Sequence, residues 1–369
     1  MIKVLHFFKT YYPDSMGGIE QVIFQIAEGT RAHGVQPEVL YLSARGAARN
    51  EAVANHLTHR SRLDLHVAST GFSLSAIKDF TELASQADVV HYHFPWPYMD
   101  LVHFLARLNK PTVVSYHSDI VKQKWLLKLY QPLMHRFFST VDRVVASSPN
   151  YAAHSPVLTR FQDKVSIIPY GLDRATYPQA SAGKLAYWRE RLGERFFLFV
   201  GALRYYKGLD FLLEAARINR LPVVIMGGGF LEAQLRQQAA ELGLGNVHFL
   251  GGLADEDKAA LLELCYGFVF PSHLRSESFG ISLLEAAMYG KPLISCEMGS
   301  GTTFINLADQ TGLVVPPRDA PALARAMQRL WDNPVMAQGM GAKAMQRYEE
   351  VFTASAMAGA YADLYRGLL

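Results

Sequence analysis

Two glutamates eight residues apart are the side chains of this chain best suited to chemistry. Glu277 lies in the segment FPSHLRSESFG, and Glu285 lies in the apolar stretch ISLLEAAMY that follows it. The pattern predicts a strand that ends before Pro271, a loop, and a helix over 281–289 that stops at Gly-Lys-Pro. A carboxylate among apolar side chains is costly unless a partner or ligand satisfies it, and the N–H groups that open a helix bind anions. The segment therefore suits a ligand with phosphates and sugar hydroxyls; a capped helix with two solvated glutamates is the alternative.

A basic turn follows a predicted buried strand in the second half of the chain. Arg204 and Lys207 come directly after the apolar run that ends at Val200. Together they could neutralise a diphosphate, the arginine through its planar fork and the lysine as a point charge. A solvated basic turn on the surface would contain the same residues.

Two glycine-rich turns stand between predicted strands and helices. Gly17 and Gly18 precede an amphipathic helix that runs to about residue 33, and Gly227 and Gly228 follow a strand. Glycines let a backbone approach a phosphate closely, and a helix N-terminus adds partial positive charge. Tight turns that serve only to start the helices account for these glycines equally well. Neither turn is a G-x-G-x-x-G sequence, which disfavours a nicotinamide dehydrogenase.

Several histidines and acidic residues are candidates for metal or sugar contacts. His117 ends a β-branched strand, where it could donate to a sugar hydroxyl or cap the strand. His91 and His93 share one face of another strand, but no Cys, Asp or third His is spaced to complete a metal site. We therefore expect both to line a cleft, and we expect no metal. The acidic triplet at 255–257 is expected to start a helix, where its charges complement the helix dipole.

Short apolar runs alternate with longer amphipathic stretches throughout the 369 residues, the pattern of parallel sheets built from βαβ units. The net charge of +3 is too small to indicate nucleic-acid binding. Cys265 and Cys296 lie in apolar sequence and are expected to be reduced, buried thiols of a cytoplasmic protein. No apolar run is long enough to span a bilayer. The expected strands are 4–8, 37–42, 89–93, 111–117, 144–146 and 165–168 in the first half, and 196–200, 222–226, 247–250, 267–270, 292–295 and 312–315 in the second.

The stretch 121–144 interleaves lysines and arginines with aromatic and aliphatic residues. A basic amphipathic helix of this kind can lie on an anionic membrane surface. A core helix with one solvated face has the same pattern, and the sequence leaves both interpretations open.

In their order along the chain, these residues resemble glycosyltransferase family four, retaining enzymes of the GT-B fold. The likeness covers nearly the whole chain. It implies an α/β protein with two Rossmann-like, doubly wound domains facing each other across a cleft. The N-terminal domain, 1–172, would bind the acceptor and pack against a C-terminal helix at about 353–369. The second domain, 185–352, would bind the nucleotide-sugar donor.

The resemblance also implies roles for five side chains. Arg204 and Lys207 would hold the donor diphosphate, and Glu285 would accept hydrogen bonds from the ribose hydroxyls. Glu277 would meet hydroxyls of the donor sugar, and His117 would lie beside the transferred sugar.

Backbone groups are the other donor contacts that the resemblance implies. Gly17 and Gly18 would approach the phosphate, and the start of the 281–289 helix would add further contacts. Family members often carry an acidic residue in place of Gly228, which leaves the base and ribose contacts of that loop open. The expected donor-binding set is Gly17, Gly18, Gly227, Gly228, Phe279, Gly280, Ile281 and Glu285.

The N-terminal segment LHFFKTYYPD and the following GIEQ look like those of bacterial O-antigen and lipopolysaccharide mannosyl- or rhamnosyltransferases. That likeness implies a metal-independent, retaining transfer of a hexose from a nucleotide-diphosphate sugar, with a GDP-sugar favoured, to a lipid-linked glycan. Such an enzyme would be cytoplasmic or peripheral on the inner face of the cytoplasmic membrane. Two alternatives are a nucleotide-sugar epimerase or hydrolase on the same scaffold, and a non-catalytic nucleotide-binding module that docks on membranes.

Overall fold

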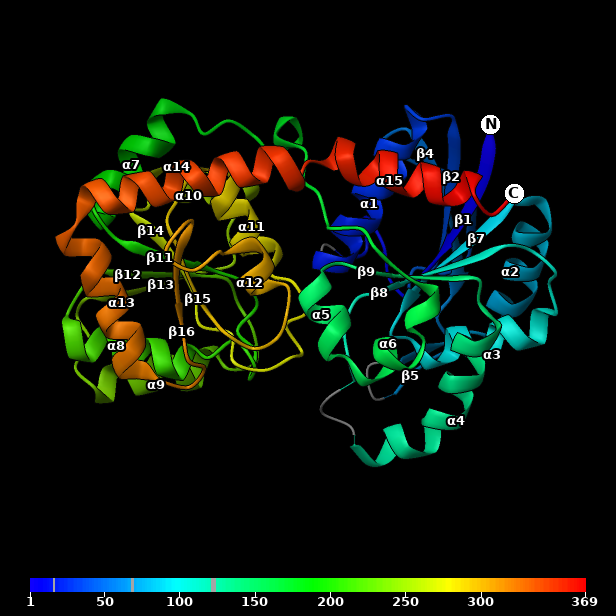
Figure 1. Ribbon diagram of the computed structural model, residues 1–369, viewed down its shortest axis with the longest axis horizontal. Coiled ribbons are helices and arrows are strands. Elements are labelled where there is room, and N and C mark those ends of the chain that lie inside the picture. The colour runs from blue at the N-terminus through cyan, green and yellow to red at the C-terminus, as the bar shows by residue number, and fades with distance from the viewer. Residues whose placement is uncertain (16, 68–69, 121–123) are drawn as a thin grey trace. The chain divides into compact units, whose positions relative to one another are not determined.

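A computed structural model describes residues 1–15, 17–67, 70–120 and 124–369, without the side chain of Lys124. The chain forms two compact units (Figure 1). One contains Met1–Leu172 together with Thr353–Leu369, and the other contains Asp173–Phe352. The second unit thus includes residues 173–184, which the sequence left as a linker. Each unit has a largely parallel sheet with helical connections, which confirms the predicted α/β class with two doubly wound domains.

The first unit is built on an eight-stranded sheet with the order β10-β9-β8-β7-β1-β2-β4-β3, in which only β3 is antiparallel to its neighbour. The central strands β7 and β8 are buried along their whole length, as expected for strands covered on both faces. A two-stranded β5-β6 hairpin lies outside this sheet. The strands are β1 (Ile2–Phe7), β2 (Val35–Ser43), β3 (Ala48–Val53), β4 (His56–Arg62), β5 (Leu65–Val67), β6 (Thr70–Phe72), β7 (Val89–Phe94), β8 (Thr112–Tyr116), β9 (Arg143–Ala146) and β10 (Val165–Ile167).

The helices of the first unit include one from the end of the chain. α15 follows Thr353, whose side chain caps it by accepting from the N–H of Ala356. It lies alongside α1, and the two helices approach closely where Gly29 meets Ala358 (Figure 1). The helices are α1 (Gly18–Arg31), α2 (Leu74–Gln86), α3 (Pro97–Ala106), α4 (Lys124–Thr140), α5 (Pro149–His154), α6 (Pro156–Arg160), η1 (Gln162–Lys164) and α15 (Ala354–Arg366).

The second unit has a six-stranded, fully parallel sheet with the order β13-β12-β11-β14-β15-β16. Its strands are β11 (Phe197–Val200), β12 (Val223–Met226), β13 (Val247–Gly251), β14 (Gly267–Phe270), β15 (Leu293–Cys296) and β16 (Gly312–Val315). Its helices are η2 (Arg174–Thr176), α7 (Ala182–Leu192), α8 (Leu209–Asn219), α9 (Glu232–Glu241), α10 (Asp255–Leu264), α11 (Ile281–Met288), α12 (Thr302–Ile305), α13 (Ala320–Asp332) and α14 (Pro334–Val351).

Every strand expected from an apolar run is present, with bounds shifted by at most a few residues. Strands β3, β4, β5 and β6 were not predicted from the sequence. β4 is largely polar (HLTHRSR), β3 mixes polar and apolar residues, and β5 and β6 have only three residues each. β3 is the edge strand, β4 lies next to it, and β5 and β6 pair outside the sheet. Packing against neighbouring segments rather than an apolar pattern selects these conformations.

In both sheets the first strand has its sequence neighbours on one side and a later strand on the other. The order reverses between β1 and β7 in the first unit and between β11 and β14 in the second. Open α/β sheets bind ligands beyond the carboxyl ends of the strands at such a reversal. The loops that follow β11 and β14 are therefore where a ligand of the second unit is expected.

The two cysteines are buried and free, as the sequence predicted. Cys265 and Cys296 are free and buried, and burial raises the pKa of Cys265 to about 11. Among the described residues, no helix is both long and apolar enough to cross a membrane.

The contact between Gly171 and Thr353 gives a stability prediction. A Cβ at Gly171 would lie 2.2 Å from the carbonyl oxygen of Thr353. Gly171→Ala should therefore lower the free energy of unfolding by about 1–3 kcal/mol, the usual cost of overpacking. Gly183→Ala is the matched control, because a Cβ there meets nothing within 4 Å and alanine favours α7. Chemical denaturation measures both, and equal stabilities would contradict the prediction.

Candidate active site

The best-defined polar cluster of the second unit joins the loops that follow β11 and β14. Nζ of Lys207 lies 2.5 Å from Oε2 of Glu277, and both side chains are nearly buried. The hydroxyl of Ser272 donates to the same carboxylate oxygen at 3.3 Å. Nζ also lies 4.7 Å from the centre of the Phe270 ring, a cation–π contact. A cation and a carboxylate are thus held at the point where the strand order reverses.

Glycines allow these loops to touch. Gly208 has a φ of +67°, and a Cβ there would lie 2.1 Å from the carbonyl oxygen of Pro271. The N–H of His273 donates to the carbonyl of Tyr206 at 2.9 Å, which joins the same two loops through their backbones. Gly208 therefore sets the distance across which Lys207 reaches Glu277.

The loop after β12 packs against the loop after β11 in a similar way. Gly227 has a φ of +130°, and its Cβ would lie 2.1 Å from the carbonyl oxygen of Gly201. Gly228 has space for a side chain, with only Glu232 nearby at 3.5 Å, and its carbonyl accepts from the N–H of Leu203. The tight turn thus accounts for Gly227, while Gly228 leaves open space at the end of β12.

The N-terminus of α11 adjoins this cluster along the chain. Gly280 is its N-cap with a φ of +101°, and as a glycine it has no side chain to cap the helix. The first N–H groups of α11, beginning at Ile281, are therefore available to an anion. Phe279 is buried, and its neighbour Ser278 accepts a hydrogen bond from the N–H of Gly301 at 2.7 Å.

Glu285 is buried in α11 and is paired within the protein. Its Oε1 accepts from the hydroxyl of Tyr177 at 2.9 Å and from Nζ of Lys258 at 3.1 Å. Burial alone would lower the pKa of Lys258, but Glu285 and Asp255 raise it overall. Both hydrogen bonds fall on Oε1, and within the described part of the chain Oε2 has no partner. Nothing in the sequence marked Tyr177 or Lys258 as partners of this carboxylate, because they lie 108 and 27 residues away from it.

Arg204 extends from the loop after β11 as an exposed side chain. It lies close enough to Tyr206 to affect the pKa of that phenol, which burial and Glu277 raise and Arg204 lowers. The second unit therefore brings together Arg204, Lys207, Glu277 and the start of α11. Their roles toward a donor stay predictions.

The acidic triplet has a structural role. It forms the first turn of α10, as predicted. Asp257 accepts from Nζ of Lys184 at 2.6 Å and from the indole N–H of Trp188 at 2.9 Å. These contacts tie α10 to α7 and account for the carboxylate without a metal.

In the first unit, the candidate glycines start α1. Gly17 is the N-cap of α1 and Gly18 is its first residue. Glu20 lies beside them and accepts hydrogen bonds from Thr10 at 2.8 Å and Ser15 at 2.7 Å. Met16 of this loop lies outside the described residues. The loop is thus held by a buried glutamate that the sequence did not single out.

His117 lies at the end of β8 and is buried. Its Nε2 is 2.9 Å from Nδ1 of His93, and its Nδ1 is 2.5 Å from the hydroxyl of Tyr170. Both ring nitrogens are therefore engaged inside the first unit. A direct hydrogen bond to a sugar requires one of these contacts to open, and the role of His117 beside a sugar stays a prediction.

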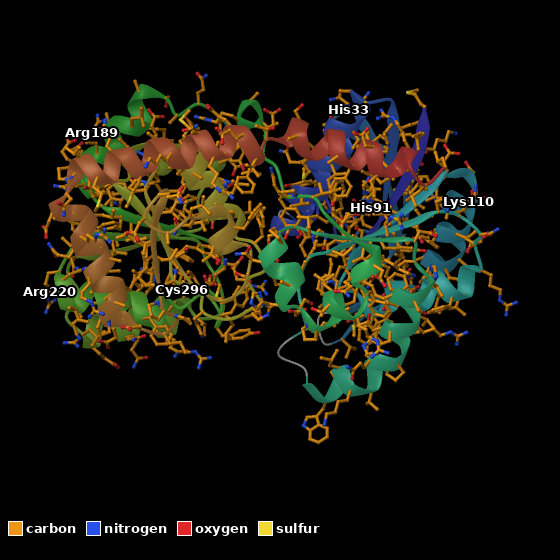
Figure 2. All side chains as sticks on the ribbon, in the orientation of Figure 1. His33, His91, Lys110, Arg189, Arg220 and Cys296 are labelled. Atoms are coloured by element: carbon orange, nitrogen blue, oxygen red, sulfur yellow. The ribbon has the colours of Figure 1, made fainter. Side chains whose placement is uncertain are left out.

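Two expectations for His91 and His93 are wrong. Both are fully buried rather than lining a cleft. His91 lies beneath α15, and its Nδ1 contacts the hydroxyl of Tyr365 on that helix (Figure 2). A third histidine also joins them: His6 on β1 brings a ring nitrogen to within 4.8 Å of theirs. The sequence could not show this, because β1 and β7 become neighbours only in the sheet.

The three histidines are close enough for a metal ion, but both ring nitrogens of His91 and of His93 have other partners. His91 contacts the hydroxyls of Tyr365 at 2.7 Å and Ser115 at 2.8 Å. His93 contacts His6 at 3.0 Å and His117 at 2.9 Å. A metal would have to displace hydrogen bonds of both rings, so this geometry favours a hydrogen-bonded network.

Comparison with known proteins gives the class and the family. Solved structures of similar fold include a sucrose-phosphate synthase from Thermosynechococcus elongatus, with a TM-score of 0.82 and 22% identity over 100% of this chain and 99% of that one. Another is Anabaena HepE in complex with UDP and glucose, with a TM-score of 0.79 and 18% identity over the full length of both chains. The fold is that of the GT-B glycosyltransferases.

The sequence matches two family descriptions, Glycosyltransferase Family 4 over residues 16–176 and Glycosyl transferases group 1 over residues 186–347. A D-rhamnosyltransferase, WbpZ, from Pseudomonas aeruginosa is 58% identical over 96% of this chain and 93% of its own length. An O-antigen chain mannosyltransferase C from Escherichia coli is 51% identical over 100% of this chain and 99% of its own. The chain belongs to glycosyltransferase family four.

The pair of Lys207 and Glu277 gives a prediction for activity. Lys207 is expected to neutralise charge that develops on a leaving diphosphate. Lys207→Ala should therefore lower kcat/KM by an amount that corresponds to about 2.7–4 kcal/mol of lost transition-state stabilisation, as for other lost charge-stabilising donors. The variant also leaves Glu277 buried without its cation, which costs stability. The double variant Lys207→Ala/Glu277→Gln should regain stability but not activity. Wild-type kcat/KM in the folded single variant would contradict the assignment.

Proposed function

We propose that the protein is a retaining hexosyltransferase that moves mannose or rhamnose from a nucleotide-diphosphate sugar, with a GDP-sugar favoured, to a growing lipid-linked glycan. The proposed pathway is O-antigen or another cell-surface polysaccharide. The observation that carries the donor assignment is the cluster of Lys207, Glu277 and the uncapped α11 N-terminus at the strand reversal of the second unit. The relatives named above, a D-rhamnosyltransferase and an O-antigen chain mannosyltransferase, support the sugar and the pathway.

The chemistry follows from the charges of the second unit. A diphosphate at this cluster receives positive charge from Lys207 and Arg204 and hydrogen bonds from the first N–H groups of α11. As the bond from the sugar to the phosphate breaks, negative charge accumulates on the leaving diphosphate, and these groups are already oriented to stabilise it. Lys207 contacts both Glu277 and the diphosphate. Because Glu277 then has to neutralise Lys207 only in part, its carboxylate is able to accept hydrogen bonds from hydroxyls of the donor sugar.

The donor assignment is tested by nucleotide binding. A bound nucleotide raises the melting temperature by mass action, by an amount equivalent to about 2.7 kcal/mol at a concentration one hundred times Kd. GDP should stabilise the protein more than UDP, ADP or TDP. Glu285→Ala should weaken nucleotide binding by about 1.5–3 kcal/mol if charged hydrogen bonds to the ribose are lost.

Tyr177→Phe is the matched control for that variant. It removes one hydrogen bond from Oε1 of Glu285 but leaves the carboxylate in place, so nucleotide affinity should stay near that of the wild type. Calorimetric titration measures both variants. Unchanged affinity in Glu285→Ala would exclude the ribose contact, and a larger shift with another nucleotide would exclude the GDP assignment.

Metal independence is part of the same proposal, because Lys207, Arg204 and the first N–H groups of α11 would neutralise a diphosphate without a metal ion. Transfer measured in excess chelator should equal transfer without it. Loss of activity that divalent ions restore would contradict the proposal. Donor turnover without acceptor, if as fast as transfer, would instead indicate an epimerase or hydrolase.

The exposed end of α4 supports a peripheral membrane location as part of this proposal. The structure divides the basic stretch 121–144 into two parts. Residues 121–123 lie outside the described part of the chain. Trp125 and Leu129, each 82% exposed, lie with Leu126 on α4, which stands out from the rest of the first unit (Figure 1). The later residues Phe137 and Phe138 instead belong to the core.

Exposed apolar side chains beside basic ones favour an anionic bilayer surface. Nζ of Lys128 lies 4.9 Å from the Trp125 ring, and Arg136 and Arg143 on the same segment are exposed. Such a segment gains free energy from apolar burial and from attraction to anionic lipids. A location on the cytoplasmic face of the membrane would bring the enzyme to a lipid-linked acceptor.

Vesicle sedimentation tests this location. The protein should bind phosphatidylglycerol vesicles more strongly than phosphatidylcholine vesicles. The double variant Trp125→Ser/Leu129→Ser should reduce binding by about tenfold or more, since each buried apolar side chain contributes about 1.5–3 kcal/mol. Leu74→Ser is the control, because Leu74 is also exposed but lies on α2. Equal binding by all three proteins would contradict membrane docking through α4.

A further inference from the structure

Three imidazoles and a phenol form a hydrogen-bonded chain inside the first unit, here called the imidazole chain. Nδ1 of His6 lies 3.0 Å from Nε2 of His93, whose Nδ1 lies 2.9 Å from Nε2 of His117. Nδ1 of His117 then lies 2.5 Å from the hydroxyl of Tyr170. The three rings come from β1, β7 and the end of β8 and are buried. The chain therefore links the interior of the sheet to a candidate site residue.

Each ring of the imidazole chain carries a single proton. Burial lowers the pKa of His6 and of His117 to about 3, and it lowers the pKa of His93 well below the ordinary value. A neutral imidazole has one N–H donor and one acceptor nitrogen. Between two such rings, one nitrogen must be protonated and the other must not be.

Only two proton arrangements satisfy both contacts between rings. In one, all three histidines carry the proton on Nδ1, and His117 donates to Tyr170. In the other, all three carry it on Nε2, and Tyr170 donates to His117. Because His93 takes part in both contacts, the tautomers of the three rings change together or not at all.

The His6 end of the imidazole chain distinguishes the two proton arrangements. Nε2 of His6 is buried and, within the described part of the protein, has no hydrogen-bond partner. The first arrangement leaves an unpaired acceptor there, whereas the second leaves an unpaired N–H. Buried N–H groups without partners are the rarer of the two in proteins, so the first arrangement is favoured.

We propose that His6 and His93 are positioning residues that hold His117 in its Nδ1–H tautomer, with the ring fixed between His93 and Tyr170. A second chain, from Tyr365 through His91 and Ser115 to Tyr361, runs beside it without contact to His117 in the described structure. The consequence for transfer rests on the proposed function and on the place that the family resemblance implies for His117, beside the transferred sugar. A ring held in one tautomer and one orientation presents the same edge to every substrate.

Nitrogen NMR of the full-length protein, labelled with ¹⁵N-histidine, tests the tautomer directly. Spectra that correlate ring protons with ring nitrogens distinguish the protonated nitrogen from the unprotonated one, and His117→Gln assigns the signals of His117. In the wild type, His117, His93 and His6 should each carry the proton on Nδ1, by roughly tenfold or more over Nε2. A proton on Nε2 of His117, or a cationic ring, would overturn the proposal without any variant.

Tyr170→Phe tests the coupling between the rings. Without the phenol, the first arrangement leaves the Nδ1–H of His117 unpaired, and the second leaves the Nε2–H of His6 unpaired. Because each then has one buried N–H without a partner, both arrangements should be populated. The signals of all three histidines should therefore change together. Tyr361→Phe is the matched control, because it removes a buried hydroxyl from the second chain only and should leave the three tautomers as they are. If only the NMR signals of His117 changed, the proposed coupling between the three rings would be contradicted.

Transfer by the same variants separates this proposal from the proposed function. Tyr170→Phe should lower kcat by roughly tenfold with a smaller change in the donor KM, since a loosely held ring is less well oriented. If the tautomers change but kcat stays at the wild-type value, the imidazole chain is supported and the role of His117 in transfer is excluded. If kcat falls while the tautomers stay unchanged, the positioning role is excluded.

Discussion

A buried ammonium group is stable only where a partner of opposite charge lies within hydrogen-bonding distance. Lys207 has that partner in Glu277, and the pair exists because two loops touch at Gly208 and Pro271. Those loops follow β11 and β14, which are neighbours only because the strand order reverses between them. The pair of Lys207 and Glu277 therefore depends on the strand order of the sheet and on the absence of a side chain at Gly208. A Cβ at Gly208 would clash with the carbonyl oxygen of Pro271 and push the two loops apart. Lys207 would then lie farther from Glu277, although neither charge had been changed.

The first unit uses polar groups differently. The face of its sheet toward α15 carries four histidines, and each has hydrogen-bond partners among neighbouring rings and hydroxyls. Burial keeps these rings neutral, so the layer is polar without being charged. Directional hydrogen bonds fix α15 and the end of β8 relative to the sheet more specifically than apolar packing alone. The same enzyme thus has a charged cluster in one unit and an uncharged polar layer in the other.

The parts of the fold that the sequence predicted are those in which a local pattern and the tertiary environment agree. The buried parallel strands are continuous apolar runs, and the helix at 281–289 and the acidic first turn of α10 have recognisable starts. The polar strand β4 has no such pattern, because it lies near the edge of the sheet, and it was not predicted. The stretch 121–144 had two interpretations, and its described part shows why: the exposed Trp125 and Leu129 and the buried Phe137 and Phe138 belong to one helix, α4.

The residue types and spacing by themselves determined the class of fold, the family likeness and the set of residues that could meet a donor. Spacing along the chain is enough for this where neighbouring residues act together, as at the start of α11. Only the tertiary structure decided which groups are partners: Lys207 with Glu277, Glu285 with Tyr177 and Lys258, and His6 with His93. These pairs are 27 to 108 residues apart in sequence. Hydrogen bonds form over about 3 Å, so such partners are set by strand order and loop contacts rather than by any local pattern.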